Sequence, residues 1–312
     1  MPVSKSSLIT LKKIDEKFVL HLFSKSIELK KNFNEHRLSS GPYHSGYKGT
    51  AALLFFEPST RTRFSFEAAS SRAGYHPMIL DGGIGTSIEK GETIEDTISN
   101  IQALRPSFFV IRCQDHVNLE QIDSLIDVPI INAGWGKRGH PTQALLDGLT
   151  IHEKLGSIAA KNILFVGDIK HSRVVASHRE LSEVLKYNMG FCAPREFLPE
   201  VISTGIQCFS NLPEALEWAD VVIALRVQKE RHENENLFLI EDYRENFGLN
   251  NERLKLAKPN AVIMHPGPIN YGVEIESEIL QDPRCVILKQ VENGAFLREA
   301  LIRSIVDKEK GD

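Results

Sequence analysis

Short, almost continuously apolar runs alternate along the chain with stretches in which apolar residues recur every three or four positions. The short runs are rich in β-branched and aromatic residues, as expected for strands buried on both faces of a parallel sheet. Seven strands are predicted: Thr50–Phe56, Phe108–Arg112, Val128–Asn132, Asn162–Val166, Ile206–Phe209, Val221–Leu225 and Ala261–Met264. Helical periodicity predicts Thr62–Ala73, Thr93–Leu104, Thr142–Leu155, Arg173–Leu185 and a last helix that contains Leu297, Ala300, Leu301, Ser304 and Ile305. This alternation of strands and helices favours an α/β fold with parallel sheets.

The length of 312 residues is that of about two domains. A long helical pattern leads to a new strand near Lys161, and this change is the candidate boundary. We therefore expect two α/β domains, residues 1–140 and 150–288, each with a mostly parallel sheet flanked by helices and joined by a connecting helix at 141–156. The segment Thr93-Ile94-Glu95-Asp96 fits a capping box at the start of its helix.

The amino-acid composition and net charge exclude several classes of protein. Hydrophobic residues make up 42% and charged residues 25% of the chain, which excludes disorder, collagen and coiled coil as the main architecture. The 37 Lys and Arg against 41 Asp and Glu give a net charge of −4, which argues against a basic nucleic-acid binder. Apolar runs stay well below the roughly 20 residues of a membrane span, and the N-terminus has no signal-peptide block. Four widely spaced cysteines indicate reduced thiols in a cytoplasmic protein, not a zinc site.

The segment that follows the first predicted strand is the strongest candidate for chemistry. It reads E-P-S-T-R-T-R from Glu57 to Arg63 and opens directly into a helix. Hydroxyl side chains suit the N-cap, free backbone N–H groups point outward there, and Arg61 adds a guanidinium that binds oxyanions through two hydrogen bonds. This combination predicts a phosphate site, although not a nucleotide P-loop, since no G-x-x-x-x-G-K-[ST] sequence occurs. A capped helix with solvated arginines is the alternative.

Other predicted strands end in the same way. Arg112 ends one strand, and the segments G-D-I-K-H-S-R (167–173), R-V-Q-K (226–229) and H-P-G-P (265–268) follow three more. Ligands of parallel α/β sheets bind beyond the carboxyl ends of the strands. These residues therefore predict one cationic cleft for small substrates with several negative charges. The missing G-x-G-x-x-G pattern excludes a nicotinamide cofactor.

Two further segments carry weaker signals. His140 and Gln143, in H-P-T-Q, could donate to a developing oxyanion and orient an amide, or Thr142 could simply cap the helix with His140 in a loop. Lys90 lies in the glycine-rich loop 81–92, where a lysine is usually solvated and gains a role only if the loop closes over a cleft. Histidines are otherwise scattered, so no metal site is predicted.

Taken together, these motifs resemble the catalytic chains of the aspartate carbamoyltransferase family. The segments that carry the resemblance are F-F-E-P-S-T-R-T-R-F-S-F-E (55–67), S-I-E-K-G-E-T (87–93), H-P-T-Q (140–143), G-D-I-K-H-S-R (167–173), R-V-Q-K-E-R (226–231) and H-P-G-P (265–268). They occur in family order, and R-V-Q-K-E-R with H-P-G-P indicates the aspartate branch. Ornithine enzymes carry H-C-L-P and S-M-G segments instead, which are absent here.

The resemblance implies an architecture and an activity. Residues 1–140 with 290–312 would bind carbamoyl phosphate, residues 150–288 would bind aspartate, and three chains would form a homotrimer with shared active sites. The reaction would transfer a carbamoyl group from carbamoyl phosphate to the amine of L-aspartate, as the second step of pyrimidine biosynthesis, without cofactor or metal. Regulatory chains or a dihydroorotase are further partners compatible with the resemblance.

The resemblance also assigns roles to individual residues. Carbamoyl phosphate would be held by Ser59, Thr60, Arg61, Thr62, Arg112, His140 and Gln143, among which Arg61, Thr62, Arg112 and His140 would be catalytic. Aspartate would be held by Lys90, Arg173, Arg226, Gln228 and the Pro266 carbonyl. Ser87 and Lys90 would come from the neighbouring chain, and Glu57 with Arg173 and Arg231 resembles the charge set linked to domain closure in this family.

The chain departs from the family pattern at two places. Trp135, with Lys137 and Arg138 close behind, stands in G-W-G-K-R-G where many members have an Asp between the glycines. Val174 follows Arg173 where some members have a hydroxyl residue.

Two rival functions remain at this point. One is a carbamoyltransferase acting on ornithine or an acylated ornithine. Arg226 and Gln228 disfavour it, because paired carboxylates need cationic partners and these would repel the ornithine side chain. The other is a catalytically silent homologue with a structural or regulatory role. The retention of the phosphate-site residues and Lys90 argues against the latter.

Overall fold

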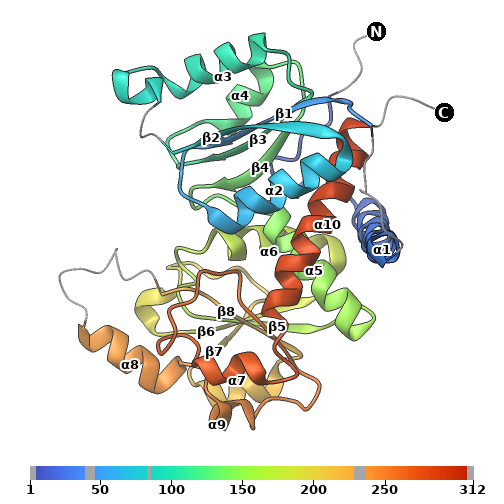
Figure 1. Cartoon of the computed structure of the whole chain (residues 1–312). Helices are drawn as coiled ribbons and strands as arrows, with labels where there is room; N and C mark the ends of the chain where they lie inside the picture. The colour runs from blue at the N-terminus through green and yellow to red at the C-terminus, as the bar shows by residue number, and fades with distance from the viewer. Residues whose placement is uncertain (1–4, 39–45, 83–85, 228–236, 308–312) are drawn as a thin grey trace. The chain divides into compact units, whose positions relative to one another are not determined.

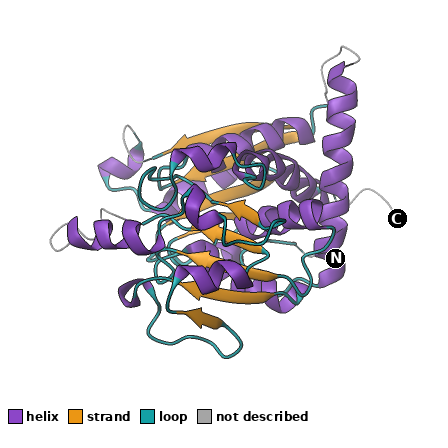
Figure 2. Cartoon of the chain, turned by 90° about the horizontal axis from the view of Figure 1, so that it is seen from below, coloured by secondary structure: helices purple, strands orange, loops and turns teal. Residues whose placement is uncertain are grey.

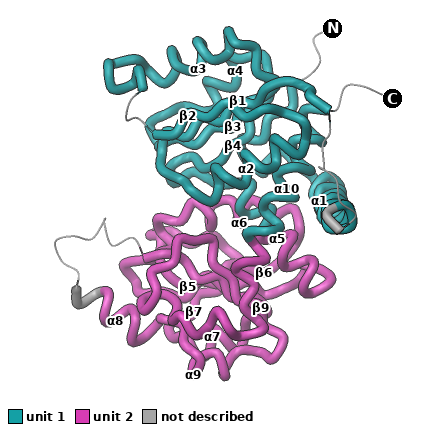
Figure 3. The backbone as a smooth tube through the Cα atoms, in the orientation of Figure 1, with its two compact units in different colours: residues 1–146, 291–312 teal, residues 147–290 magenta. Residues whose placement is uncertain are grey.

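The computed structural model describes residues 5–38, 46–82, 86–227 and 237–307. The chain folds into two compact units, one of residues 1–146 and 291–312 and the other of residues 147–290 (Figure 3). The second unit is therefore a continuous segment, whereas the first is made of two separated segments.

Unit 1 is built on a four-stranded parallel sheet. Its strands are β1 (Gly49–Phe55), β2 (Tyr75–Asp81), β3 (Phe108–Cys113) and β4 (Ile130–Trp135), in the order β2-β1-β3-β4. The central strands β1 and β3 are almost completely buried, as their unbroken apolar sequences require. The edge strand β2 is half-exposed and tolerates Pro77, which cannot donate to a ladder.

Helices cover both faces of this sheet (Figure 1). One face packs on α3 (Ile94–Ala103) and α4 (Leu119–Leu125), and the other packs on α2 (Thr60–Ala73). The Thr93 side chain caps α3 by accepting a hydrogen bond from the Asp96 N–H at 3.0 Å. The remaining elements of this unit are α1 (Glu16–Leu38), the 3₁₀ turn η1 (Ser87–Lys90) and α10 (Ile287–Val306), most of which belongs to this unit.

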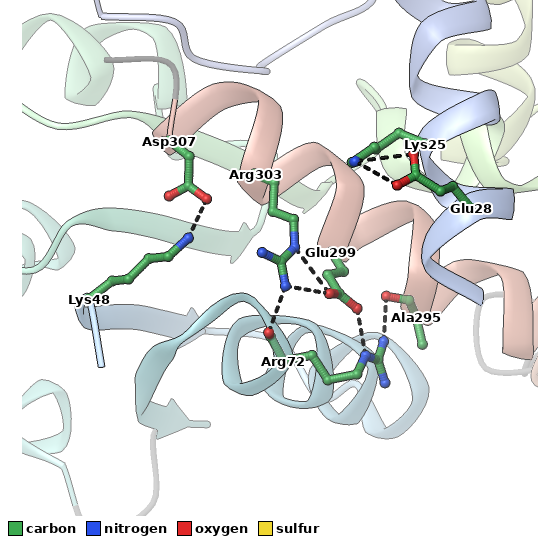
Figure 4. A network of polar contacts seen from close by, with 8 residues as sticks. All are labelled: Lys25, Glu28, Lys48, Arg72, Ala295, Glu299, Arg303 and Asp307. Atoms are coloured by element: carbon green, nitrogen blue, oxygen red, sulfur yellow. Dashed lines mark hydrogen bonds and ion pairs between the residues drawn. The ribbon is translucent and has the colours of Figure 1, made fainter. Parts of the chain in front are cut away.

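The last helix, α10, is tied to α2 by a buried charge cluster (Figure 4). The Glu299 carboxylate, whose side chain is 1% exposed, accepts from Arg72 Nε at 2.6 Å and from two nitrogens of Arg303 at 2.8 and 3.1 Å. Arg72 also donates to the Ala295 carbonyl, and Arg303 donates to the Arg72 carbonyl. These contacts join the final helix to a part of the chain more than 220 residues earlier.

Unit 2 is built on a five-stranded parallel sheet. Its strands are β5 (Asn162–Val166), β6 (Asn188–Cys192), β7 (Gln207–Phe209), β8 (Val221–Ala224) and β9 (Val262–Met264), in the order β7-β6-β5-β8-β9. Its helices are α6 (Arg173–Leu185), α7 (Leu212–Trp218), α8 (Leu237–Phe247), α9 (Asn251–Leu254) and most of α5 (Pro141–Leu155), with 3₁₀ turns η2 (Arg195–Phe197) and η4 (Ser277–Gln281). Figure 2 shows strands with helices on both sides.

The predicted α/β class, with parallel sheets flanked by helices, is confirmed. All seven predicted strands exist, with ends that differ by up to three residues. The sequence prediction missed the strands β2 and β6 and several helices, among them the long α1. Within the described ranges, every helix is too short or too polar to cross a membrane.

Candidate active site

In unit 1, the candidate residues gather at the carboxyl edge of the sheet. The strand order reverses between β1 and β3, because β2 lies on one side of β1 and β3 on the other. Such a switch point leaves a crevice where the two following loops separate, and ligands of open α/β sheets bind there. Ser59 to Thr62 follow β1, and Arg112 lies at the end of β3.

The N-terminus of α2 is a suitable place for an anion. Ser59 is the N-cap, with an extended backbone and no side-chain cap hydrogen bond, and the first turn contains no acidic residue. Thr60 and Arg61 are exposed, whereas Thr62 is 7% exposed. The free N–H groups and the positive end of the helix dipole favour a dianion at this position. Arg63, the residue after Thr62, forms an ion pair with Asp81.

Arg112 lies beside this helix end because β1 and β3 are paired. Phe55 is the register partner of Arg112, and the Phe56 N–H donates to the Arg112 carbonyl at 2.9 Å. The Arg112 side chain is 15% exposed, with Nε 3.6 Å from a Glu57 oxygen and NH1 3.4 Å from the Ala133 carbonyl. A largely buried guanidinium is thereby directed to the switch point of the sheet.

His140 and Gln143 lie where β4 leads into α5. The His140 carbonyl accepts the Gln143 N–H at 2.9 Å, so His140 begins the helix, and the two residues are 5% and 8% exposed. Thr142 is fully buried, and its hydroxyl accepts from Arg298 at 3.4 Å. Thr142 is therefore fixed from the side of α10, and His140 and Gln143 are buried where β4 leads into α5.

Ser87 and Lys90 lie in η1, at the far end of the loop that follows β2. Both are exposed in the single chain. The turn ends at Gly91, which adopts a left-handed backbone with φ of 94°.

Unit 2 has an equivalent switch point between β5 and β8. Arg173 opens α6 after β5, with Ser172 as N-cap, and Arg226 comes two residues after the end of β8. The Leu225 N–H donates to the Val166 carbonyl at 2.7 Å and ties the two loops together at their start. Gly167, with φ of 126°, is needed here because a Cβ would lie 2.6 Å from the Leu225 carbonyl oxygen.

The turn that contains Pro266 follows β9, the neighbour of β8. The His265 N–H donates to the Gln290 side chain at 3.0 Å, and the Gly267 N–H donates to His265 Nδ1 at 2.7 Å. Gln290 in turn donates to Asp147 at 2.8 Å, and the other Asp147 oxygen lies 3.2 Å from His178 Nε2. The turn therefore rests on a buried polar network.

Sequence reasoning missed Asp147, His178 and Gln290 as supports of this turn. They lie on three different helices, and no local motif joins them to His265. Gln228 and Arg231, which were predicted to contribute, lie outside the described residues.

We name the residues at the two edges by unit. The first cluster is Ser59, Thr60, Arg61, Thr62, Arg112, His140 and Gln143, and the second cluster is Arg173, Arg226 and Pro266. Hydrogen-bond donors and guanidinium groups dominate both clusters, so both favour anionic ligands over cations. Among the described residues, no three His, Cys, Asp or Glu side chains are grouped as metal ligands.

Comparisons with known proteins identify what these features resemble. Residues 6–153 match the family model described as "Aspartate/ornithine carbamoyltransferase, carbamoyl-P binding domain", and residues 159–305 match "Aspartate/ornithine carbamoyltransferase, Asp/Orn binding domain". The aspartate carbamoyltransferase catalytic subunit of Syntrophotalea carbinolica is 41% identical over 262 residues, which cover 84% of this chain and 83% of that protein. That of Campylobacter hominis is 37% identical over 309 residues, 98% of this chain and 99% of that protein.

Solved structures agree with these sequence matches. Aspartate transcarbamoylase from Trypanosoma cruzi in complex with carbamoyl phosphate superposes with a TM-score of 0.84 and 28% identity, covering 97% of this chain and 96% of that chain. The same enzyme in complex with N-(phosphonacetyl)-L-aspartic acid gives a TM-score of 0.83 and 28% identity, with 98% of each chain covered.

Proposed function

The chain belongs to the aspartate/ornithine carbamoyltransferase family, and we propose that it transfers the carbamoyl group of carbamoyl phosphate to the amine of L-aspartate. The products are N-carbamoyl-L-aspartate and phosphate, a step of pyrimidine biosynthesis. One observation carries the proposal: two donor-rich, cationic clusters lie at the switch points of two separate parallel sheets. Carbamoyl phosphate carries an anionic phosphate and L-aspartate carries two carboxylates, so one cluster suits each of them.

The first cluster takes carbamoyl phosphate. The phosphate lies on the N-terminus of α2, where Ser59, Thr60 and Thr62 supply hydroxyl and backbone donors and Arg61 supplies a guanidinium. The absence of an acidic residue in this first helical turn supports the assignment, because a carboxylate there would compete with phosphate. Arg112 contributes a second guanidinium from the neighbouring strand.

The second cluster takes L-aspartate. Arg173 and Arg226 follow adjacent strands and bind the two carboxylates, together with Gln228. The Pro266 carbonyl accepts from the aspartate amine, and the network under His265 holds this turn in place. An ornithine side chain would carry a positive charge towards two arginines, so this cluster favours the aspartate branch of the family.

The chemistry follows from these positions. The aspartate amine attacks the carbamoyl carbon, a C–N bond forms, and negative charge builds on the carbamoyl oxygen. Thr62, Arg112 and His140 donate to that oxygen, and one such donor typically stabilises the transition state by about 2.7–4 kcal/mol. Gln143 orients the carbamoyl NH₂. The C–O bond to phosphate then breaks, Arg61 and the helix N-terminus stabilise the leaving group, and phosphate accepts the amine proton.

A homotrimer with shared sites, located in the cytoplasm, is the part of the proposal that rests on the family resemblance. In it, Ser87 and Lys90 serve the site of the neighbouring chain. The exposure of both residues in the single chain supports this assignment.

The deciding experiment measures phosphate release from carbamoyl phosphate with L-aspartate or L-ornithine as the acceptor. Turnover with aspartate alone is expected, and turnover with ornithine alone would overturn the acceptor assignment. Arg61→Ala should abolish turnover. Arg63→Ala is the matched control, because this arginine of the same helical turn is paired with Asp81. Full activity in Arg61→Ala would contradict the phosphate site.

Subunit complementation tests the shared site. Lys90→Ala and Arg112→Ala chains should each be inactive alone. If they are mixed after dissociation and allowed to reassemble, some sites receive both intact residues and activity returns. A mixture that stays inactive, while a mixture of wild-type and Lys90→Ala chains reassembles normally, would contradict sharing of the site.

A further inference from the structure

The turn between β4 and His140 carries the one motif to which the proposed function gives no role. Trp135, the last residue of β4, is 2% exposed, and its indole Nε1 donates to the Val117 carbonyl at 2.8 Å. The Arg138 guanidinium lies 4.5 Å above the centre of the indole ring. The Trp135 indole is therefore held by a hydrogen bond at its edge and by a cation–π contact on its face.

The backbone of Trp135 sets the position of His140. Its N–H donates to the Gly139 carbonyl at 2.9 Å, and its carbonyl accepts from the N–H groups of Arg138 and Gly139 at 2.8 and 3.3 Å. His140 follows directly and begins α5 through its own carbonyl. The chain between Trp135 and His140 is thus closed into a tight turn, and a shift of Trp135 is passed on to His140.

The same residue also bears on Arg112. The pairing of β3 with β4 shifts register between Ile111 and Cys113, and Trp135 is the partner of Cys113 after the shift. Between these two pairs β3 advances by two residues and β4 by three, so the extra residue lies in β4, opposite Arg112. The bulged segment includes Ala133, whose carbonyl accepts a hydrogen bond from Arg112 NH1 at 3.4 Å. Because bulges re-aim groups next to active sites, the pairing of Trp135 with Cys113 fixes the Ala133 carbonyl that holds the Arg112 side chain.

Asp115 fastens the turn to the end of β3. Its carboxylate accepts the Lys137 N–H at 2.6 Å, and the Gly136 N–H donates to the Cys113 carbonyl at 2.8 Å. Gly136 has φ of 43°, and a Cβ there would lie 2.7 Å from the Asp115 nitrogen and would overlap its carboxylate. Hydrogen bonds therefore join residues 113–117 to residues 135–139 around the buried Trp135 side chain.

We propose that Trp135 is a positioning residue that sets Arg112 and His140 together, because the buried indole fixes both the strand irregularity that directs Arg112 and the turn that delivers His140. The inference rests on the proposed function, in which these two residues donate to the carbamoyl oxygen. A single side chain would then align two donors that come from different strands.

Trp135→Phe is the test variant, because it keeps an aromatic ring and removes the indole N–H and part of its surface. Trp218→Phe is the matched control, since Trp218 is the other tryptophan of the chain and lies in unit 2. We expect kcat/KM for carbamoyl phosphate to fall about tenfold or more in Trp135→Phe, as small misplacements of catalytic groups do. It should stay within about twofold of wild type in Trp218→Phe, and equal kcat/KM values in the two variants would overturn the proposal.

A double-mutant cycle separates positioning from general destabilisation. If Trp135 acts through Arg112 and His140, Trp135→Phe should cost less in a His140→Ala background than in wild type, because only its effect on Arg112 is left there. If it only weakens the fold, the loss should be the same in both backgrounds, and that result would overturn the proposal. Should Trp135→Phe fail to fold, Arg138→Ala replaces it in the same cycle, since it removes only the exposed cation above the ring.

A binding readout keeps this inference distinct from the proposed function. Inorganic phosphate should raise the Tm of wild type and of Trp218→Phe equally, and should raise that of Trp135→Phe by less than half as much. Equal rises in all three proteins would overturn the positioning role, whereas no rise in wild type would contradict the phosphate site of the proposed function. If wild type turns over ornithine and not aspartate, the acceptor assignment fails, and the cycle is then run with ornithine.

Discussion

The buried carboxylate of Glu299 offers a direct test of how the last helix is held. Glu299→Ala removes the acceptor of three hydrogen bonds and leaves the guanidinium groups of Arg72 and Arg303, whose side chains are only 16% and 20% exposed, beside an empty position. Removing one partner of a buried ion pair costs about 3–5 kcal/mol, because the remaining charge is left without compensation. Two arginines lose their partner here, so the upper part of that range is expected.

The measurement is the thermal unfolding midpoint of the purified variant. For a unit of this size, each kcal/mol lowers Tm by about 2–4 °C, so a loss of about 4–5 kcal/mol in Glu299→Ala should lower Tm by roughly 8–20 °C. Glu276→Ala is the matched control. It removes the same type of side chain from a pair with Arg244 at 3.1 Å, but that arginine is 59% exposed. Exposed pairs contribute about 0–1 kcal/mol.

The comparison can refute the reasoning in two ways. A Tm loss in Glu299→Ala no larger than that in Glu276→Ala would mean that burial does not strengthen the cluster. A large loss in both variants would mean that the cost comes from the missing carbon atoms of glutamate and not from its charge. Glu299→Gln distinguishes the contributions further, because it keeps the shape and removes the charge.

Three further predictions concern backbone strain, pH and thiol reactivity. Gly167→Ala should destabilise by about 1–3 kcal/mol more than Gly156→Ala in urea unfolding, because both have positive φ but only Gly167 has a backbone oxygen within 2.6 Å of the new Cβ. Hydrogen bonds from the Arg284 side chain and backbone lower the pKa of Asp282. The stability advantage of wild type over Asp282→Asn should therefore be constant above about pH 5 and be lost as pH falls below about 4, and a pH-independent difference in Tm would contradict this prediction. Burial raises the pKa of Cys192 to about 12, whereas Cys208 is exposed. An aromatic disulfide reagent should therefore label Cys208 in the native protein and Cys192 only after unfolding. Cys208→Ser should remove the rapid labelling.

Much of the fold could be predicted from the sequence because buried parallel strands have continuous apolar runs. Strands β1, β3, β5 and β8 were found nearly to the residue, and the Thr93 cap was found from its local motif. Strand β2 escaped because it is an edge strand with Pro77 and half-exposed residues. Strand β6 escaped because Asn188 and Gly190 interrupt its apolar pattern.

The candidate site shows a similar division. The helix N-terminus at Ser59 to Thr62 could be predicted because hydroxyls, arginines and a helix start are adjacent in the sequence. The irregular pairing around Arg112 could not be predicted, because it exists only once β3 and β4 are side by side. The roles of Trp135 and Gln290 likewise depend on contacts between distant segments, which no local pattern contains.

The division of the chain has a consequence for biosynthesis. Unit 2 is contiguous and has all of its residues once Gln290 has been synthesised, whereas unit 1 still lacks its last segment, 291–312. Domains fold in the order in which they leave the ribosome. Here unit 1 is the first to be synthesised but the last to complete its fold, because Glu299, the partner of Arg72, is synthesised more than 220 residues after it. Until then, the face of α2 that later contacts α10 is uncovered. Nascent chains stalled shortly before residue 299 would therefore expose this face to a chaperone.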